Sequence, residues 1–104
     1  MLEAMGAGVQ AVSRALHETV TFNTTRVTSL DWVTYPILRF KDTPKVTTVV
    51  VQRKELVPLG AGESPHPDVA PAIANAFFDA TGVRIREAPM TPARVRGVLK
   101  AAGM

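Results

Sequence analysis

A short loop with two glycines and a carboxylate is the part of this sequence best suited to chemistry. Gly60, Ala61, Gly62 and Glu63 follow one another in a proline-rich stretch, directly ahead of a helical pattern. Glycines let a backbone pass close to a bulky ligand, and the next carboxylate is then presented at the ligand's edge. In a pocket without water, Glu63 could act as a general base. The competing interpretation is an exposed turn glutamate, because short strings of this kind are common.

Other side chains able to bind metals or react are few. The chain has no cysteine, and its two histidines, His17 and His66, are far apart and lack ligand-spaced carboxylates. Disulfides and thiolate sites are therefore excluded within the chain, and we expect no metal bound by its side chains. His66 stands three residues after Glu63 and could hydrogen-bond it. A loop histidine between two prolines is more often exposed, so we do not count it as catalytic.

Length and composition describe one soluble domain over residues 1–104. Of the 104 residues, 46% are hydrophobic, and they fall in separate patterned runs. No run reaches the length of a membrane span, and no secretory signal opens the chain, so we expect a cytoplasmic protein unless an upstream segment carries a signal. The formal charge of +3 is mild, and no aromatic residues interleave with the basic ones, so no nucleic-acid partner is expected.

Three helices must position the loop. The first follows from apolar residues that recur at steps of three and four, namely Leu2, Met5, Val9, Val12 and Leu16. Asp68 is a suitable N-cap for the second helix, which Gly82 ends. Thr91 and Pro92 begin the third, which runs to about Ala102.

Four short runs have the composition of β-strands. Residues 19–22 and 26–30 form a predicted hairpin, and residues 46–51 are almost wholly β-branched, as in a strand buried on both faces. Residues 83–86 alternate apolar and basic side chains, as in a half-buried strand. Together with the helices, these runs predict an α+β fold, with a small mixed sheet and about three helices.

Some polar and aromatic residues outside the loop have structural interpretations. Trp32 and Tyr35 are expected to pack in the core, since aromatic pairs beside strands are usually buried. Asn75 is expected either to bond back to the loop backbone or to be solvated, with neither favoured. The arginines after Gly82 are expected to form a solvated face or to meet another part of a larger protein.

Several blocks of the sequence carry a family resemblance. In chain order they are residues 12–18, 27–40, 60–63, 72–76, 79–84 and 89–92. Their order and approximate spacing resemble the C-terminal end of the molybdopterin-binding large subunit of the xanthine dehydrogenase and aldehyde oxidase family, the molybdenum hydroxylases. The resemblance covers nearly the whole chain and is closest to the bacterial nicotinate and isoquinoline dehydrogenase types.

The resemblance implies a reaction and a cofactor. In that family the glutamate of the Gly-x-Gly-Glu loop is the general base in the hydroxylation of aldehydes or N-heterocycles with water-derived oxygen. Glu63 matches this glutamate, and Gly60, Ala61 and Gly62 would line the cofactor. The family's molybdenum is held by molybdopterin, often as the cytosine dinucleotide, and takes no ligand from an amino acid. Ser64 stands where many members have proline, which is expected to loosen the loop without removing the base.

The resemblance also implies missing surroundings. The family places several hundred residues ahead of the block that begins at Leu2, so we expect residues 1–104 to be the C-terminal segment of the second molybdopterin-binding domain. Its partners would be the remainder of that subunit, with which it shares the cofactor, an iron–sulfur subunit, and a flavin or cytochrome electron-transfer partner. The isolated chain is expected to be inactive. The alternative is a noncatalytic standalone fragment or small interaction module that keeps the fold.

Overall fold

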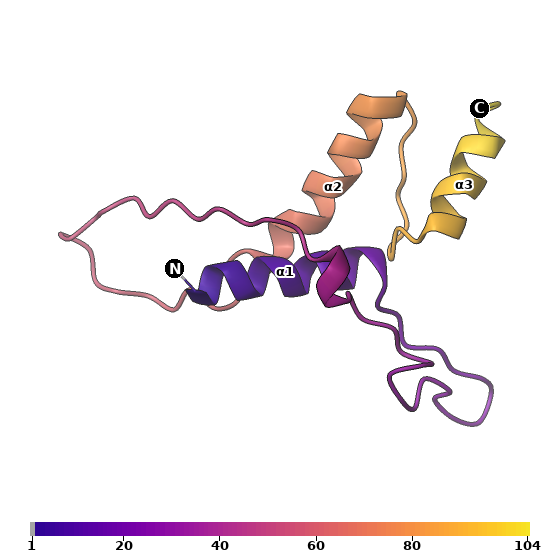
Figure 1. Cartoon of the computed structure of the whole chain (residues 1–104), viewed down its shortest axis with the longest axis horizontal. Coiled ribbons are helices and arrows are strands. Elements are labelled where there is room, and N and C mark those ends of the chain that lie inside the picture. The colour runs from indigo at the N-terminus through magenta and orange to yellow at the C-terminus, as the bar shows by residue number, and fades with distance from the viewer. Residues whose placement is uncertain (1) are drawn as a thin grey trace.

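The computed structural model describes residues 2–104, in which three α-helices and one short 3-10 helix form (Figure 1). They are α1 (Leu2–Leu16), η1 (Phe40–Asp42), α2 (His66–Thr81) and α3 (Pro92–Ala101). α1 lies across the middle of the molecule and α2 rises from it, with long loops on either side (Figure 1). Met1, included in the predicted domain, lies outside the described residues. Between residues 2 and 104, no helix is long and apolar enough to cross a membrane.

The three predicted helices are present, and local signals set two of their boundaries. The Thr91 side chain caps α3 by accepting a hydrogen bond of 3.3 Å from the Arg94 N–H. Gly82 ends α2 in the left-handed conformation, at φ 71°, and donates its N–H to the Phe78 carbonyl over 2.7 Å. Glycine adopts this conformation without the steric cost that a Cβ brings, so it terminates the helix as expected.

The start of α2 differs from the prediction. The helix begins at His66, and Pro65 is its N-cap, so it starts ahead of the predicted cap at Asp68. Asp68 lies instead in the first turn, where a carboxylate interacts favourably with the positive end of the helix dipole. A carboxylate is preferred both at the cap and in the first turn, and the sequence signal does not separate the two positions.

The predicted α+β fold is wrong, because residues 2–104 contain no sheet. Of the hairpin predicted over residues 19–30, only an isolated bridge between Phe22 and Val27 forms. Residues 46–51 and 83–86 are not in strands. A β-branched run becomes a strand only when a neighbouring backbone completes its hydrogen bonds, and the described part of the chain supplies no such neighbour.

The buried core is small and is built on the alanine face of α1. Its buried apolar residues are Ala7, Ala11, Ala15, Ile85 and Met90. The three alanines are four residues apart and so share one helix face. The cluster of Ala15, Ile85 and Met90 packs with residues of α2, namely Ala70, Ile73, Ala74 and Phe77. The Met90 N–H donates to the Ala15 carbonyl over 2.7 Å, which fastens the segment after α2 to the end of α1.

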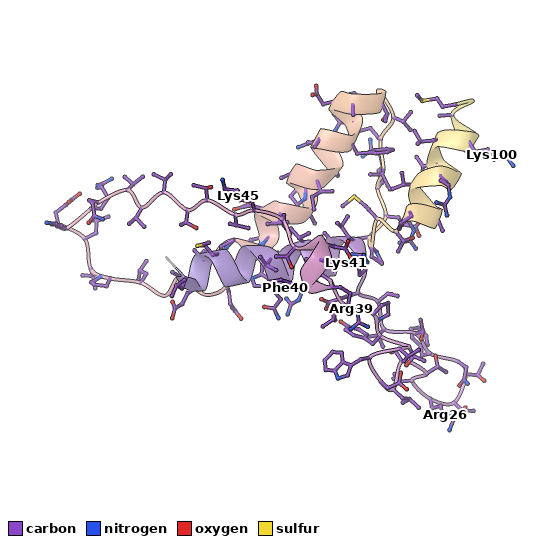
Figure 2. All side chains as sticks on the ribbon, in the orientation of Figure 1. Arg26, Arg39, Phe40, Lys41, Lys45 and Lys100 are labelled. Carbon is purple, nitrogen blue, oxygen red and sulfur yellow. The ribbon has the colours of Figure 1, made fainter. Side chains whose placement is uncertain are left out.

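Much of the large apolar side-chain area is exposed. The stripe on α1 that predicted the helix is covered only in part, and Leu2 is 83% exposed. Phe40, which projects from η1, is 96% exposed (Figure 2). Val49, Val50 and Val51 are also exposed. These large apolar side chains are suited to being covered by another part of a larger protein.

Candidate functional site

The Gly60 to Glu63 loop lies on the surface immediately before α2. All four of its residues are exposed. The Glu63 carbonyl accepts a hydrogen bond of 3.0 Å from the His66 N–H, which forms the turn that leads into the helix. The loop is therefore anchored at its C-terminal end by the start of α2, and its glycines lie ahead of that anchor.

The two loop glycines are not required by the fold of this chain. A Cβ built on Gly60 or on Gly62 would meet no atom within 4 Å. Neither glycine has a positive φ, in contrast to Gly82 and Gly103. Glycine is needed where a backbone adopts unusual angles or is closely approached by other atoms. Neither reason applies within residues 2–104, so the backbone at both glycines is open to approach by a ligand or by another part of the protein.

An open cavity of about 690 Å³ adjoins the loop. It is lined from α1 by Gln10 and Arg14, and from the loop and the start of α2 by Gly62, Glu63, His66 and Pro67. His66 Nε2 lies 3.2 Å from Gln10 Oε1, so its side chain bonds α1 and not the Glu63 carboxylate. This contact ties the loop end of α2 to the middle of α1.

The cavity offers a mixed set of polar groups. Arg14 contributes a positive charge, Glu63 a negative one, and Gln10 an amide that can donate or accept. Across residues 2–104, no group of three His, Cys, Asp or Glu side chains is placed to hold a metal ion. An arginine beside an exposed glycine backbone is a suitable surface for a cofactor with anionic oxygens.

Comparison with known proteins finds relatives that share this sequence over most of its length. The chain is 45% identical over 98 residues to one of the subunits of nicotinate dehydrogenase from Pseudomonas putida, an alignment that covers 94% of the chain and 8% of that protein. It is 37% identical over 90 residues to the membrane-bound aldehyde dehydrogenase (pyrroloquinoline-quinone) of Gluconacetobacter polyoxogenes. That alignment covers 86% of the chain and 12% of that protein.

Both relatives are dehydrogenases. No protein family model matches the chain. The chain spans only a small part of each relative's length, 8% of the first and 12% of the second. The similarity therefore places this sequence beside segments of oxidoreductases.

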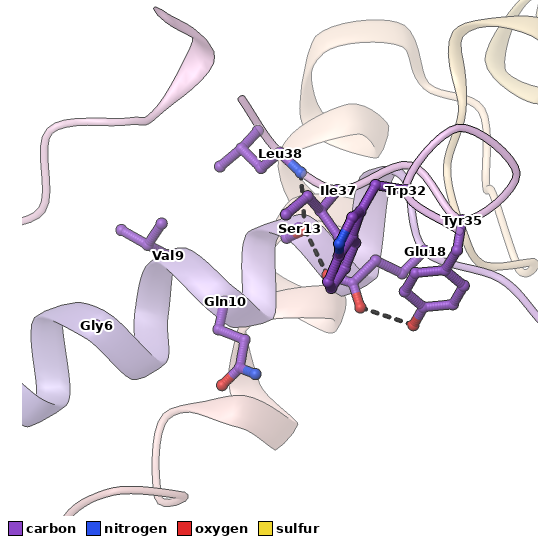
Figure 3. A pocket seen from close by; sticks show the side chains of 9 residues that line it. All are labelled: Gly6, Val9, Gln10, Ser13, Glu18, Trp32, Tyr35, Ile37 and Leu38. Atoms are coloured by element: carbon purple, nitrogen blue, oxygen red, sulfur yellow. Dashed lines mark hydrogen bonds between the residues drawn. The ribbon is translucent and has the colours of Figure 1, made fainter. Parts of the chain in front are cut away.

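A second polar cluster joins the end of α1 to residues 30–38 (Figure 3). Ser13 is 5% exposed, and its hydroxyl donates to Glu18 Oε1 and accepts a hydrogen bond of 2.9 Å from the Leu38 N–H. The Tyr35 hydroxyl donates to Glu18 Oε2 over 2.8 Å. This hydrogen bond to Glu18, helped by partial burial, raises the pKa of Tyr35. The cluster holds residues 30–38 against the helix.

Ser13 was not singled out from the sequence, although a signal for it exists. It lies within α1 near its C-terminal end, beside Val9 and Val12 of the apolar stripe. A hydroxyl buried at such a position must find hydrogen-bond partners, since an unpaired buried polar group is costly. The need for a partner could thus have been predicted, but its identity could not, because Leu38 is 25 residues away in the sequence.

Trp32 does not pack in a core, so that prediction is wrong. Its side chain is 65% exposed and lines an open cavity of about 390 Å³ together with Tyr35 (Figure 3). The remaining lining residues are Gly6, Val9, Gln10, Ser13, Glu18, Ile37 and Leu38. The predicted strands do not form, so no second layer covers the indole ring.

A compact turn presents Trp32 to this cavity. Asp31 Oδ1 accepts hydrogen bonds from the Thr34 N–H (2.9 Å), the Thr34 hydroxyl (2.8 Å) and the Val33 N–H (3.0 Å). These bonds favour the charged carboxylate and hold the pKa of Asp31 below its usual range, with the Thr34 N–H as the largest cause.

Asn75 is exposed to solvent, as one of its two predicted roles has it, and it does not bond back to the loop backbone. Its Oδ1 accepts a hydrogen bond of 2.9 Å from Arg84 Nη1, and the same guanidinium lies 3.6 Å from the centre of the Phe78 ring. Arg94 donates to the Pro89 carbonyl, and its Nε lies 3.5 Å from Glu87 Oε2. Two of the arginines after Gly82 therefore bind groups of their own chain.

Basic side chains are spread over the chain and do not gather at the Glu63 cavity. Arg26, Lys45 and Lys100 lie on three separate parts of the chain (Figure 2). Arg14 is the basic residue that lines the cavity.

Proposed function

We propose that this chain is the C-terminal segment of a molybdopterin-binding domain in an oxidative hydroxylase, and that Glu63 is its general base. The observation that carries the proposal is the pair of glycines at 60 and 62, which the chain's own fold does not need and which adjoin the Glu63 cavity. The two dehydrogenase relatives, each matched over more than four fifths of the chain, support the oxidoreductase class.

The residues around the loop fit a large anionic cofactor. The Gly60, Ala61 and Gly62 backbone is open to close approach, and Arg14 lines the same cavity with a positive charge. We propose molybdenum–molybdopterin, in the free or the cytosine dinucleotide form, as this cofactor, shared with the remainder of the subunit. When bound, it supplies the redox centre that takes two electrons from the substrate.

The task of Glu63 is to remove a proton while water-derived oxygen is added to the substrate. A carboxylate performs this best where bulk water is excluded and its position is fixed. In this chain Glu63 is exposed, so in our proposal the covering wall comes from residues outside 1–104. The isolated chain is therefore inactive in our proposal. The relatives' names indicate small aldehydes or N-heterocycles, such as nicotinate, as the substrate class.

The exposed apolar surface indicates where such a polypeptide would pack. Val49, Val50 and Val51 are 83%, 51% and 78% exposed, and Phe40 is 96% exposed. We propose that the remainder of the molybdopterin-binding subunit covers this surface, and that an iron–sulfur subunit and a flavin or cytochrome partner carry the electrons away. The Pseudomonas relative is itself named as a subunit.

A noncatalytic module that keeps this fold is the second candidate. The observation that favours it is the exposure of Glu63, because a base open to water gains little from its position. The two candidates differ in a measurable way, since only the first needs a cofactor and a covering polypeptide.

The test is to isolate the tagged chain from its source organism, identify what copurifies, and analyse the eluate for molybdenum and for pyrroloquinoline quinone. Stoichiometric molybdenum with a large-subunit polypeptide supports the proposal. Pyrroloquinoline quinone without molybdenum, as the name of the second relative would indicate, contradicts the cofactor assignment. A chain with neither cofactor contradicts the catalytic proposal and leaves the noncatalytic module.

A further inference from the structure

The cleft between α1 and residues 30–38 contains a carboxylate that the proposed reaction does not use. The Glu18 oxygens accept hydrogen bonds from the hydroxyls of Ser13 and Tyr35. The ion pairs found in residues 2–104 involve Asp42, Glu55 and Glu87, and none involves Glu18. A carboxylate has about four lone-pair directions, so two remain for further donors. Glu18 is therefore a partly buried negative charge able to accept a cation.

The walls of the cleft suit an organic cation. The indole of Trp32 and the phenol of Tyr35 lie beside the Glu18 side chain (Figure 3). Aromatic faces, that of tryptophan most of all, attract ammonium and guanidinium groups. Farther along the cleft, Val9, Ile37 and Leu38 provide an apolar wall. A ligand with a cationic head and a hydrocarbon stem matches both parts.

The surrounding charges also favour a cation. Asp31 lines an adjoining cavity of about 330 Å³ that shares Trp32 and Tyr35 with the cleft. The charged residues that line the cleft and this adjoining cavity are Glu18 and Asp31, both acidic, whereas Arg14 lines the Glu63 cavity.

We propose that this cleft receives an arginine or lysine side chain of the polypeptide that covers this face of the chain. The guanidinium or ammonium group would pair with Glu18 over the Trp32 ring, and its stem would lie along the apolar wall. The rim favours a protein over a free small molecule, because Leu30 and Val33 are 72% and 85% exposed and need a broad covering surface. The proposal rests on the partner required by the proposed function, but not on its molybdenum chemistry.

The first arm of the test uses the full chain and the fluorescence of Trp32, which is its single tryptophan. The chain is titrated with n-propylguanidinium, and with n-propanol and propanesulfonate as neutral and anionic counterparts. We expect a saturable change with the cation alone. Glu18→Gln should raise the dissociation constant about tenfold, the size of one charge-assisted hydrogen bond. Glu3→Gln, an equal change of charge at an exposed site in the first turn of α1, should leave it unaltered.

Equal responses to all three compounds, or an unchanged constant in Glu18→Gln, overturn the proposal. Circular dichroism checks that Glu18→Gln keeps the wild-type helix content. Trp32→Leu provides a second variant, whose binding is followed by calorimetry, and the exposed position of the indole means that the substitution removes little packing. It should lose the preference for the cation.

The second arm measures binding of the chain to the remainder of the subunit. Glu18→Gln should weaken this binding about tenfold and reduce its salt dependence, whereas Glu3→Gln should leave it unchanged. If the cleft binds propylguanidinium but Glu18→Gln leaves the complex intact, the partner side chain is excluded and the proposal is overturned. If the complex forms but the cleft shows no preference for propylguanidinium in the first arm, this inference is overturned and the proposed function stands. If no polypeptide binds the chain, the proposed function fails with it.

Discussion

The Tyr35 hydroxyl donates a hydrogen bond of 2.8 Å to Glu18 Oε2, across 17 residues of sequence. With the Ser13 hydroxyl on the other carboxylate oxygen, this contact fixes the loop after α1 against the helix that carries Gln10 and Arg14. One end of α1 is thus held by the Glu18 cluster, and its middle lines the Glu63 cavity.

The Tyr35 phenol should report directly on this contact. Tyr35 is the single tyrosine, so the ultraviolet absorbance of the phenolate follows it alone. The hydrogen bond to Glu18 raises its pKa, and Glu18→Gln should lower that pKa toward the ordinary value, with Glu3→Gln unchanged. A raised pKa means that the contact stabilises the fold below the unfolded value of about 10 and is lost as the pH rises through the folded value. An unaltered pKa in Glu18→Gln would contradict the contact.

Removal of the Ser13 hydroxyl should destabilise the chain. Ser13→Ala leaves the Leu38 N–H without its partner and takes a donor from Glu18. A buried group left unpaired costs about 1–3 kcal/mol. The free energy of unfolding, from urea denaturation followed by circular dichroism, should fall by that amount. Ser64→Ala, at an exposed loop position, should change it by less than about 0.5 kcal/mol. Equal effects of the two substitutions would show that the cluster contributes nothing.

Two glycine substitutions should act in opposite directions. Gly97 lies within α3, and a Cβ there would meet no atom within 4 Å. Gly97→Ala should therefore stabilise the chain by about 0.5–1 kcal/mol through helix propensity. Gly82 also has free space, but its φ is 71°. Gly82→Ala should destabilise by about 1–2 kcal/mol because a Cβ strains the left-handed conformation. The midpoint of thermal unfolding should rise for the first variant and fall for the second.

The turn that presents Trp32 should open in acid. Its hydrogen bonds, foremost that from the Thr34 N–H, lower the pKa of Asp31. A lowered pKa means that the bonds contribute stability above the unfolded pKa of the carboxyl and lose it as the pH falls through the folded value. The amide resonances of Val33 and Thr34 should therefore shift together below the ordinary aspartate range. Asp31→Asn should abolish this shift, and persistence of the shift in that variant would assign it to another group.

The helices could be predicted because their signals are local. The Thr91 side chain caps α3 through a residue three positions away, and Gly82 ends α2 through its own backbone angles. Residues 46–51 have an equally clear β-strand composition, but a strand depends on a second backbone, and composition does not say whether one is present. The prediction of a sheet was wrong because no second backbone within residues 2–104 pairs with these residues. Trp32 is exposed because, without a sheet, no second layer covers it.

The candidate site was only half visible in the sequence. The Gly60 to Glu63 loop is contiguous and could be found from residue types alone. Gln10 and Arg14 lie some fifty positions earlier, and only the packing of α1 against the start of α2 brings them to the same cavity. The Glu18 cluster likewise joins residues that no sequence spacing connects.

The role of Glu63 is tested most directly by turnover in the assembled complex. Glu63→Gln should keep molybdenum and the partner polypeptide at wild-type stoichiometry and lower the rate of aldehyde or N-heterocycle oxidation by about 10²- to 10⁴-fold, the usual contribution of a positioned base. Glu55→Gln is the matched control, since that exposed glutamate lies five residues before Gly60 and pairs with Arg53. It should retain full activity. A Glu63→Gln complex that contains molybdenum and turns over at the wild-type rate would contradict the assignment of Glu63 as the base.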